Sequence, residues 1–159
     1  ITPIDTRANV AYFGTFGYEL DVTKLTDYEK EKVKQQVAFF KKNRQMIHNG
    51  IFYRLSNPFT SNETSWLVVS SDKTEAIVGY YKVLAKPNDS YSRLKVKGLD
   101  PEKLYTINNS ITTHYGDELM NVGIVLAEDY TDRASEYWSR ESPHDYYSKL
   151  FVIKEYTRT

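Results

Sequence analysis

The chain has 159 residues, which suffice for one small domain with an attached element but not for a complete (β/α)₈ barrel of about 250 residues. Its 21 basic and 21 acidic residues give no net charge, so nothing in the composition attracts nucleic acid or an anionic membrane. The absence of cysteine excludes disulfides and thiolate chemistry and predicts a cytoplasmic location, and no apolar stretch approaches the roughly 18 residues of a membrane span.

The first expected element is a short strand at Asn9–Phe13, NVAYF, an apolar run without clean alternation. That pattern is typical of a strand covered on both faces, as in a parallel sheet. Gly14 and Gly17 end the run, and we interpret both as glycines needed for backbone freedom. A phosphate-binding loop is not indicated, because the lysine of a P-loop is missing.

A long amphipathic helix is expected next, over Asp27–Ile47. Thr26 and Glu29 form the T-x-x-E pattern of a capping box, which marks a helix start. Apolar residues then recur at helical spacing on one face, at Val33, Val37, Phe40 and Ile47. The helix should end at His48, Asn49 and Gly50, with Gly50 in the left-handed position after the helix.

After Gly50 the pattern changes to short β-type runs separated by turn residues. About seven such runs at this spacing predict an antiparallel sandwich that adjoins the helix near Asn49 without a flexible linker. The runs are IFYRL, SWLVVSS, EAIVGYYKVLA, SRLKVKG, LYTINNS, VGIVLAE and KLFVIKEY.

Two acidic pairs are candidates for chemistry. Glu19 and Asp21 follow the expected strand, where barrel enzymes carry catalytic groups, but a retaining glycosidase needs carboxyl groups about 5–5.5 Å apart. The alternative is hydrogen bonding at the helix entry. Asp117 and Glu118 lie in an expected polar loop, and two side chains fall short of the six to eight oxygens of a Ca²⁺ site. A turn or an inter-domain contact is the alternative for this pair.

The histidines and aromatic residues give two further hypotheses. His48, His114 and His144 lack the spacing of zinc ligands, so we expect surface or helix-terminal positions and no metal site. Trp66, Tyr80, Tyr81 and Tyr91 are candidates for a sugar-stacking platform, with packing in the sheet as the alternative. Alternation predicts that Tyr80 and Tyr81 point to opposite faces.

Several long strings resemble the C-terminal end of bacterial α-galactosidases of glycoside hydrolase family 36. They are TRANVAYFGTFGYELD from Thr6, GIFYRLSNP from Gly50, GLDPEKLY from Gly98 and GDELMNVG from Gly116. The resemblance implies that residues 1–49 are the last β/α unit of a catalytic (β/α)₈ barrel, with its last strand and long helix. It implies that residues 50–159 are a C-terminal antiparallel β-sandwich, so the expected fold is mainly β.

The resemblance also implies a function for a larger parent protein. Family members are retaining enzymes that hydrolyse terminal α-galactosides of the raffinose or melibiose type, without a metal or cofactor, and bacterial members commonly form tetramers. Their catalytic aspartates lie on earlier barrel strands, so no catalytic residue is expected in this chain and the piece should be inactive alone. Two alternatives stay open, a carbohydrate-binding sandwich and a protein-interaction surface. We also expect Asn9–Phe13 to be poorly packed, or paired with another chain, where its barrel neighbours are missing.

Overall fold

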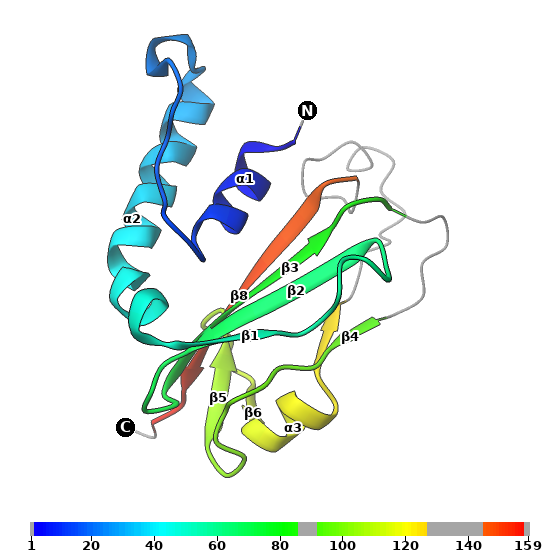
Figure 1. Ribbon diagram of the computed structural model, residues 1–159. Coiled ribbons are helices and arrows are strands. Elements are labelled where there is room, and N and C mark those ends of the chain that lie inside the picture. The colour runs from blue at the N-terminus through cyan, green and yellow to red at the C-terminus, as the bar shows by residue number, and fades with distance from the viewer. Residues whose placement is uncertain (1, 86–91, 127–144, 158–159) are drawn as a thin grey trace.

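In the computed structural model, which describes residues 2–85, 92–126 and 145–157, one antiparallel sheet organises the molecule. Six strands pair in the order β1-β2-β3-β8-β5-β6, and a second sheet consists of β4 and β7 (Figure 1). The strands are β1 Ile51–Arg54, β2 Glu63–Val69, β3 Glu75–Lys82, β4 Ser92–Leu94, β5 Leu104–Ile107, β6 Thr113–Tyr115, β7 Ile124–Leu126 and β8 Tyr147–Glu155. The helices are α1 Ile4–Ala11, the 3₁₀ turn η1 Val22–Lys24, α2 Asp27–Asn49 and α3 Gly116–Asn121.

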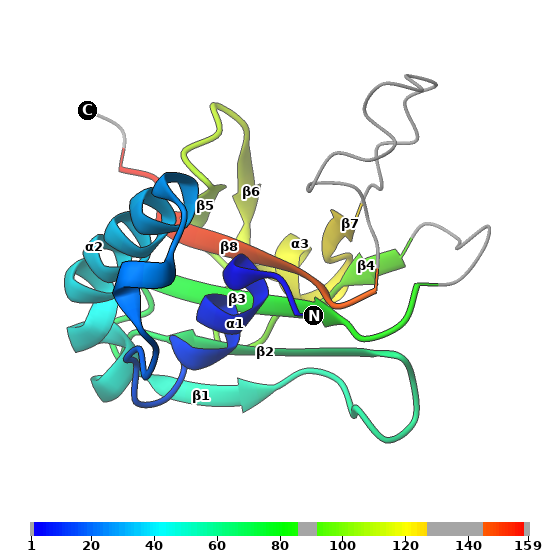
Figure 2. The ribbon, with the colours of Figure 1, turned by 90° about the horizontal axis from the view of Figure 1, so that it is seen from above.

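Side chains alternate across the large sheet, so each face has its own core. One face carries Leu67, Val78 and Phe151, which pack against the layer formed by β4, β7 and α3. On the other face Ile77 packs with Ala8 of α1, with Tyr12 directly after α1, and with Ile47 of α2. Figures 1 and 2 show the two helices on one side of β2, β3 and β8. The expected antiparallel β-sandwich is therefore confirmed, with a second sheet of short strands.

The N-terminal segment is helical, so the expected strand at Asn9–Phe13 is wrong. Helix α1 covers Ile4–Ala11, and Ala8 and Tyr12 both lie on its buried side, each 3% exposed. Their spacing of four residues is the helical signal, and the four-residue apolar run from Val10 to Phe13 concealed it. The expectation of poor packing here is also wrong for Tyr12, whose ring contacts aromatic rings at Phe16, Phe39 and Phe40.

Helix α2 confirms the predicted cap and extends two residues beyond Ile47. The Thr26 hydroxyl accepts from the backbone N–H of Glu29, and the Glu29 carboxylate accepts from the backbone N–H of Thr26. Gly50 follows, but its φ of −79° is extended, so the predicted left-handed conformation is wrong. A Cβ there would lie 2.5 Å from Val68 and 2.6 Å from the carbonyl of Val69. Gly50 is thus required by close packing on β2.

The core-facing side of α2 also differs from the predicted one. Its buried residues are Gln36, Asn43 and Ile47, whereas Val33 and Val37 are only half-buried. Asn43 satisfies its amide by donating to the carbonyl of Phe39. An apolar side of this helix therefore remains partly open.

Besides α1 and the short turn η1, the sequence did not predict β6 or α3. The string GDELMN forms α3 rather than a polar loop, because Leu119 is buried in the core against the large sheet. Gly116 begins this helix where a Cβ would lie only 1.9 Å from the carbonyl oxygen of Asp100. The two family-like strings that contain Asp100 and Gly116 are therefore packed directly on each other.

Candidate functional site

Glu19 and Asp21 are exposed and do not form an arrangement suited to catalysis. The Asp21 carboxylate caps η1, where it accepts from the hydroxyl of Thr23 at 2.6 Å and from its backbone N–H at 3.0 Å. These hydrogen bonds hold the pKa of Asp21 below its usual range, so the group is a fixed carboxylate. The interpretation of Asp21 as a helix-entry residue is confirmed.

Asp117 and Glu118 lie in the first turn of α3, and Glu118 pairs with a histidine. Nδ1 of His114 on β6 lies 2.9 Å from Oε1 of Glu118. The backbone N–H of Asp117 donates to the carbonyl of Pro101. Among the described residues no group of three or more His, Cys, Asp or Glu side chains could hold a metal ion. These acidic residues thus fix α3 to its neighbours.

The other histidines have no catalytic surroundings in the part of the chain that is described. His48 lies in the last turn of α2, and its ring contacts the edge of Phe40. This confirms the expected helix-terminal position. His144 lies outside the described residues.

Gly14 and Gly17 are not at positions where backbone freedom demands glycine. Neither has the positive φ found at Gly98 and Gly123, and no atom lies within 4 Å of a Cβ placed at Gly17. The interpretation that these two glycines are needed for backbone freedom is therefore wrong within the described chain.

The aromatic residues do not form an exposed sugar platform. Tyr80 and Tyr81 point to opposite faces as predicted, and both are buried. The Tyr81 hydroxyl donates to the carbonyl of Asn9 in α1, and its ring lies 4.4 Å from that of Trp66. The indole N–H of Trp66 is buried and has no hydrogen-bond partner among the described residues, so it is not open to a ligand. Tyr91 lies outside the described residues.

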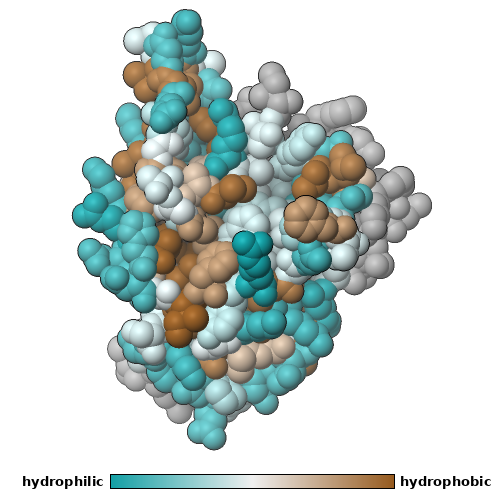
Figure 3. Space-filling model, in the orientation of Figure 1, coloured by the Kyte–Doolittle hydropathy of each residue, from teal (hydrophilic) through white to brown (hydrophobic). Residues whose placement is uncertain are grey.

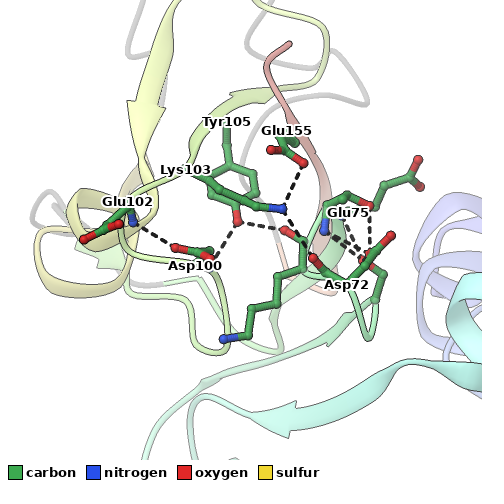
Figure 4. Close-up of polar contacts among 10 residues, drawn as sticks. Asp72, Glu75, Asp100, Glu102, Lys103, Tyr105 and Glu155 are labelled. Carbon is green, nitrogen blue, oxygen red and sulfur yellow. Dashed lines mark hydrogen bonds and ion pairs between the residues drawn. The ribbon is translucent and has the colours of Figure 1, made fainter.

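The densest polar contacts lie where β3, β5 and β8 meet the strings GLDPEKLY and SSDK (Figure 4). The Tyr105 hydroxyl accepts from the backbone N–H of Asp100 at 3.1 Å and donates to the carbonyl of Lys73 at 2.7 Å. Lys103 pairs with Glu155 at 3.1 Å. Each of these groups has a partner within the chain, so the cluster is structural.

A first hollow, of about 290 Å³, opens between α1, α2 and β8. Its polar residues are joined, because the Asp5 carboxylate accepts from Gln36 at 2.9 Å and pairs with Lys32 at 3.1 Å. The hydrogen bond that the Lys32 ammonium donates to Asp5 raises the pKa of Lys32. Tyr18 donates to the same Gln36. The polar groups therefore join the two helices to each other.

A second hollow, of about 280 Å³, lies on the opposite face of the sheet, under the loop between β1 and β2. Glu63 and Ser65 of β2 line it, together with Arg93 of β4. Sequence reasoning missed it because its residues come from strands that are distant along the chain. Its lining combines hydroxyl, charged and apolar side chains.

Of the helices among the described residues, none combines the length and apolarity that crossing a membrane requires. Two family models match the chain. The Glycosyl hydrolase family 36 C-terminal domain matches residues 63–153, which contain most of the sheet. Melibiase matches residues 1–50, which contain α1 and α2. The chain therefore belongs to glycoside hydrolase family 36, as the family-like strings predicted.

Known proteins agree with this assignment. The α-galactosidase AgaA of Geobacillus stearothermophilus is 46% identical over 138 residues, 87% of this chain and 19% of that protein. The α-galactosidase Mel36A of Lactobacillus acidophilus is 42% identical over 123 residues, 77% of this chain and 17% of that protein. A crystal structure of the α-galactosidase from Lactobacillus brevis superposes with a TM-score of 0.89 and 44% identity, covering 100% of this chain and 21% of that one. This chain thus spans about a fifth of the length of the relatives it matches.

Proposed function

We propose that this chain is the C-terminal part of a bacterial, cytoplasmic α-galactosidase, with residues 1–49 completing a catalytic barrel whose other units lie outside it and residues 50–159 forming the C-terminal domain. The parent would release terminal α-galactose from raffinose- or melibiose-type sugars with retention, through a covalent galactosyl-enzyme and without metal or cofactor. AgaA, one of the similar proteins, has been crystallised in complex with raffinose. The cysteine-free sequence and the bacterial relatives support the cellular setting.

The observation that carries the proposal is the match of residues 1–50 to Melibiase, together with the open side of the helical unit they form. Val10, Val22 and Tyr28 expose about half of their surfaces there. Figure 3 shows brown, apolar side chains gathered over the side of the molecule where α1, α2 and β1 lie. A surface of this kind marks an interface, and the rest of the melibiase domain is the partner that the family match supplies.

The glycines at positions 14 and 17 fit the same proposal. Gly17 has open space where a Cβ would be, so its lack of a side chain serves no contact within the described chain. A neighbouring barrel segment that passes close to the backbone would give both residues a purpose. We place the boundary between the barrel unit and the sandwich at Asn49, where α2 ends and leads directly into β1.

In this proposal no residue of the chain is catalytic. Both catalytic carboxylates lie on the barrel, and Glu19 and Asp21 serve the loop before α2. We also propose that the parent is a homo-oligomer, by resemblance a tetramer. Phe59, 94% exposed at the tip of the β1–β2 loop, and the fully exposed Ile111 supply apolar contacts suited to a second copy.

Hydrolysis of a chromogenic α-galactoside tests the proposal, with the full-length parent and this chain assayed side by side. We expect turnover by the parent and none by the chain. The Glu19→Gln and Asp21→Asn variants of the parent should keep their activity to within a few-fold, because neither carboxylate reacts. Turnover by the chain itself, or loss of turnover in both variants, would return these carboxylates to a catalytic role. A parent without activity would refute the assignment.

A further inference from the structure

The inner face of the large sheet changes from apolar to charged along β2 and β3. Leu67 of β2 lies opposite Val78 of β3 within the core. Four pairs further along the register, and therefore on the same face, Glu63 lies opposite Lys82. A sheet face buried under a second layer normally carries apolar residues throughout. The change therefore marks a part of this face with a role besides packing.

Among the described residues, the short strands of the second sheet lie against the apolar part of the face. Its strands β4 and β7 have three residues each, and their buried residues Leu94 and Ile124 contact the apolar half of the large sheet. Beyond them lies the second hollow, of about 280 Å³, bounded on one side by the β1–β2 loop. The hollow thus results from two sheets of unequal strand length.

Polar groups line this hollow, and one of them, Glu63, faces a buried ammonium group outside the lining. The Lys82 side chain is 3% exposed, and its Nζ lies 3.8 Å from Oε1 of Glu63, which lines the hollow. Ser65, also 3% exposed, shares a 2.9 Å hydrogen bond with the hydroxyl of Ser56. Burying an ammonium group and hydroxyls costs free energy unless polar partners offset it, so this part of the face keeps a polar environment that includes Glu63 and Ser56.

The lining matches a neutral polyhydroxyl ring. The Glu63 carboxylate and the serine hydroxyls accept hydrogen bonds from sugar hydroxyls, and the exposed guanidinium of Arg93 at the rim donates to them. Leu55, Leu94 and Leu126 supply an apolar wall for the C–H faces of the ring. A phosphate group would be attracted by Arg93 and Lys95, which both line the hollow, and repelled by the Glu63 carboxylate, so phosphate is the competing probe. The volume suits a single ring, since it lies just below the range of about 300–1,000 Å³ found for larger ligands.

We propose that this hollow, lined by Glu63, Ser65 and Arg93, is a second carbohydrate site that holds one hexose unit of an oligosaccharide. It lies on the opposite face of the sheet from α1 and α2, and so from the side where the barrel would pack. The hollow would retain substrate near the parent enzyme without taking part in hydrolysis. The choice of a galactoside as its ligand rests on the proposed function, whereas the presence of a sugar site does not.

Calorimetric titration of this chain with raffinose tests the site, with galactose, glucose and inorganic phosphate as further probes. We expect one raffinose per chain, and we expect Glu63→Gln and Arg93→Gln each to weaken binding by about tenfold or more. Arg93 is exposed, so its variant carries little risk of misfolding. The matched controls are Glu75→Gln, at the other end of β3, and Arg44→Gln, on the exposed side of α2, and both should bind as the unmodified chain does.

No raffinose binding by the chain, or equal binding by the hollow variants and their controls, would overturn the proposal. Binding of phosphate in place of sugar would also overturn it. Measurements on the full-length parent distinguish the second site from the proposed function. In the parent, Glu63→Gln and Arg93→Gln should each lose one of two bound sugars per subunit and keep the hydrolytic rate. If the parent is active and the hollow variants do not change its sugar binding, the second site is refuted and the proposed function is not. An inactive parent whose C-terminal chain still binds sugar refutes the proposed function alone.

Discussion

The hydroxyl of Tyr105 on β5 donates a 2.7 Å hydrogen bond to the backbone carbonyl of Lys73, 32 residues earlier in the chain. Lys73 has a positive φ of 58° in the turn between β2 and β3, and β8 lies between that hairpin and β5 in the sheet. The bond therefore crosses over from one half of the sheet to the other. It fixes a strained turn that has no direct strand pairing to β5.

Removing this hydroxyl should destabilise the fold. In Tyr105→Phe the carbonyl of Lys73 and the N–H of Asp100 both lose their partner next to a side chain that is fully buried. We expect a loss of about 1–3 kcal/mol in the free energy of unfolding, measured by urea denaturation. Tyr115→Phe, at a half-exposed position, is the control and should change stability little. Equal stability of the two variants would show that this bond contributes nothing.

Two glycine substitutions should have opposite effects. In Gly116→Ala the new Cβ would meet the backbone carbonyl of Asp100 at 1.9 Å, and backbone cannot move aside as a flexible side chain does. We expect a destabilisation of about 1–3 kcal/mol. Gly17→Ala meets no atom within 4 Å and should be neutral or stabilise this chain by up to about 1 kcal/mol. Thermal unfolding of both variants checks the pair, and a stable Gly116→Ala protein would contradict the observed packing.

The Asp72 carboxylate should make the stability of the β2–β3 turn depend on acid. It accepts from the hydroxyls of Ser70 and Thr74 and from the backbone N–H of Thr74, which lowers its pKa from 3.8 to about 2. A carboxyl group with a lowered pKa in the folded state stabilises the protein above its unfolded pKa. That contribution is lost as the pH falls from about 4 to about 2.

Asp72→Asn should therefore unfold with a midpoint that depends less on pH over this range than that of the unmodified chain. Thermal melts at several pH values between 2 and 6 would measure the difference. Glu102→Gln removes an exposed carboxylate that accepts no hydrogen bond in the described residues, and it should leave the slope unchanged. The prediction fails if Asp72→Asn and Glu102→Gln reduce the pH dependence of the unfolding midpoint by the same amount.

The capping box of α2 offers a local test. Thr26→Ala removes the hydroxyl that accepts from the backbone N–H of Glu29 and should cost about 0.5–2 kcal/mol. Thr112→Ala, at an exposed position outside any helix, is the matched control. Amide exchange should become faster in the first turn of α2 and stay unchanged in β3. Uniformly faster exchange would instead mean that α2 and the sheet unfold as one unit.

Much of the local structure could be predicted from the sequence because its causes lie within a few residues. Thr26 and Glu29 define a helix start through contacts with each other. The apolar run in EAIVGYYK indicates β3, and the alternating side-chain direction of a strand places Tyr80 and Tyr81 on opposite faces. The same reasoning failed at Asn9–Phe13, where an apolar run fits strand and helix equally and only the packing of Ala8 and Tyr12 decides. It failed at GDELMN, where burial of Leu119 outweighs a polar composition.

By itself the sequence determined the family, the capped helix and the strands apart from β6. Only the tertiary structure decided that β8, the last strand, lies in the middle of the sheet between β3 and β5. It alone placed Gly50 and Gly116 against neighbouring backbone and brought Glu63, Ser65 and Arg93 around one hollow. The reason is physical, since caps and alternation depend on neighbours in the chain, whereas hollows and close backbone contacts depend on which distant strands meet.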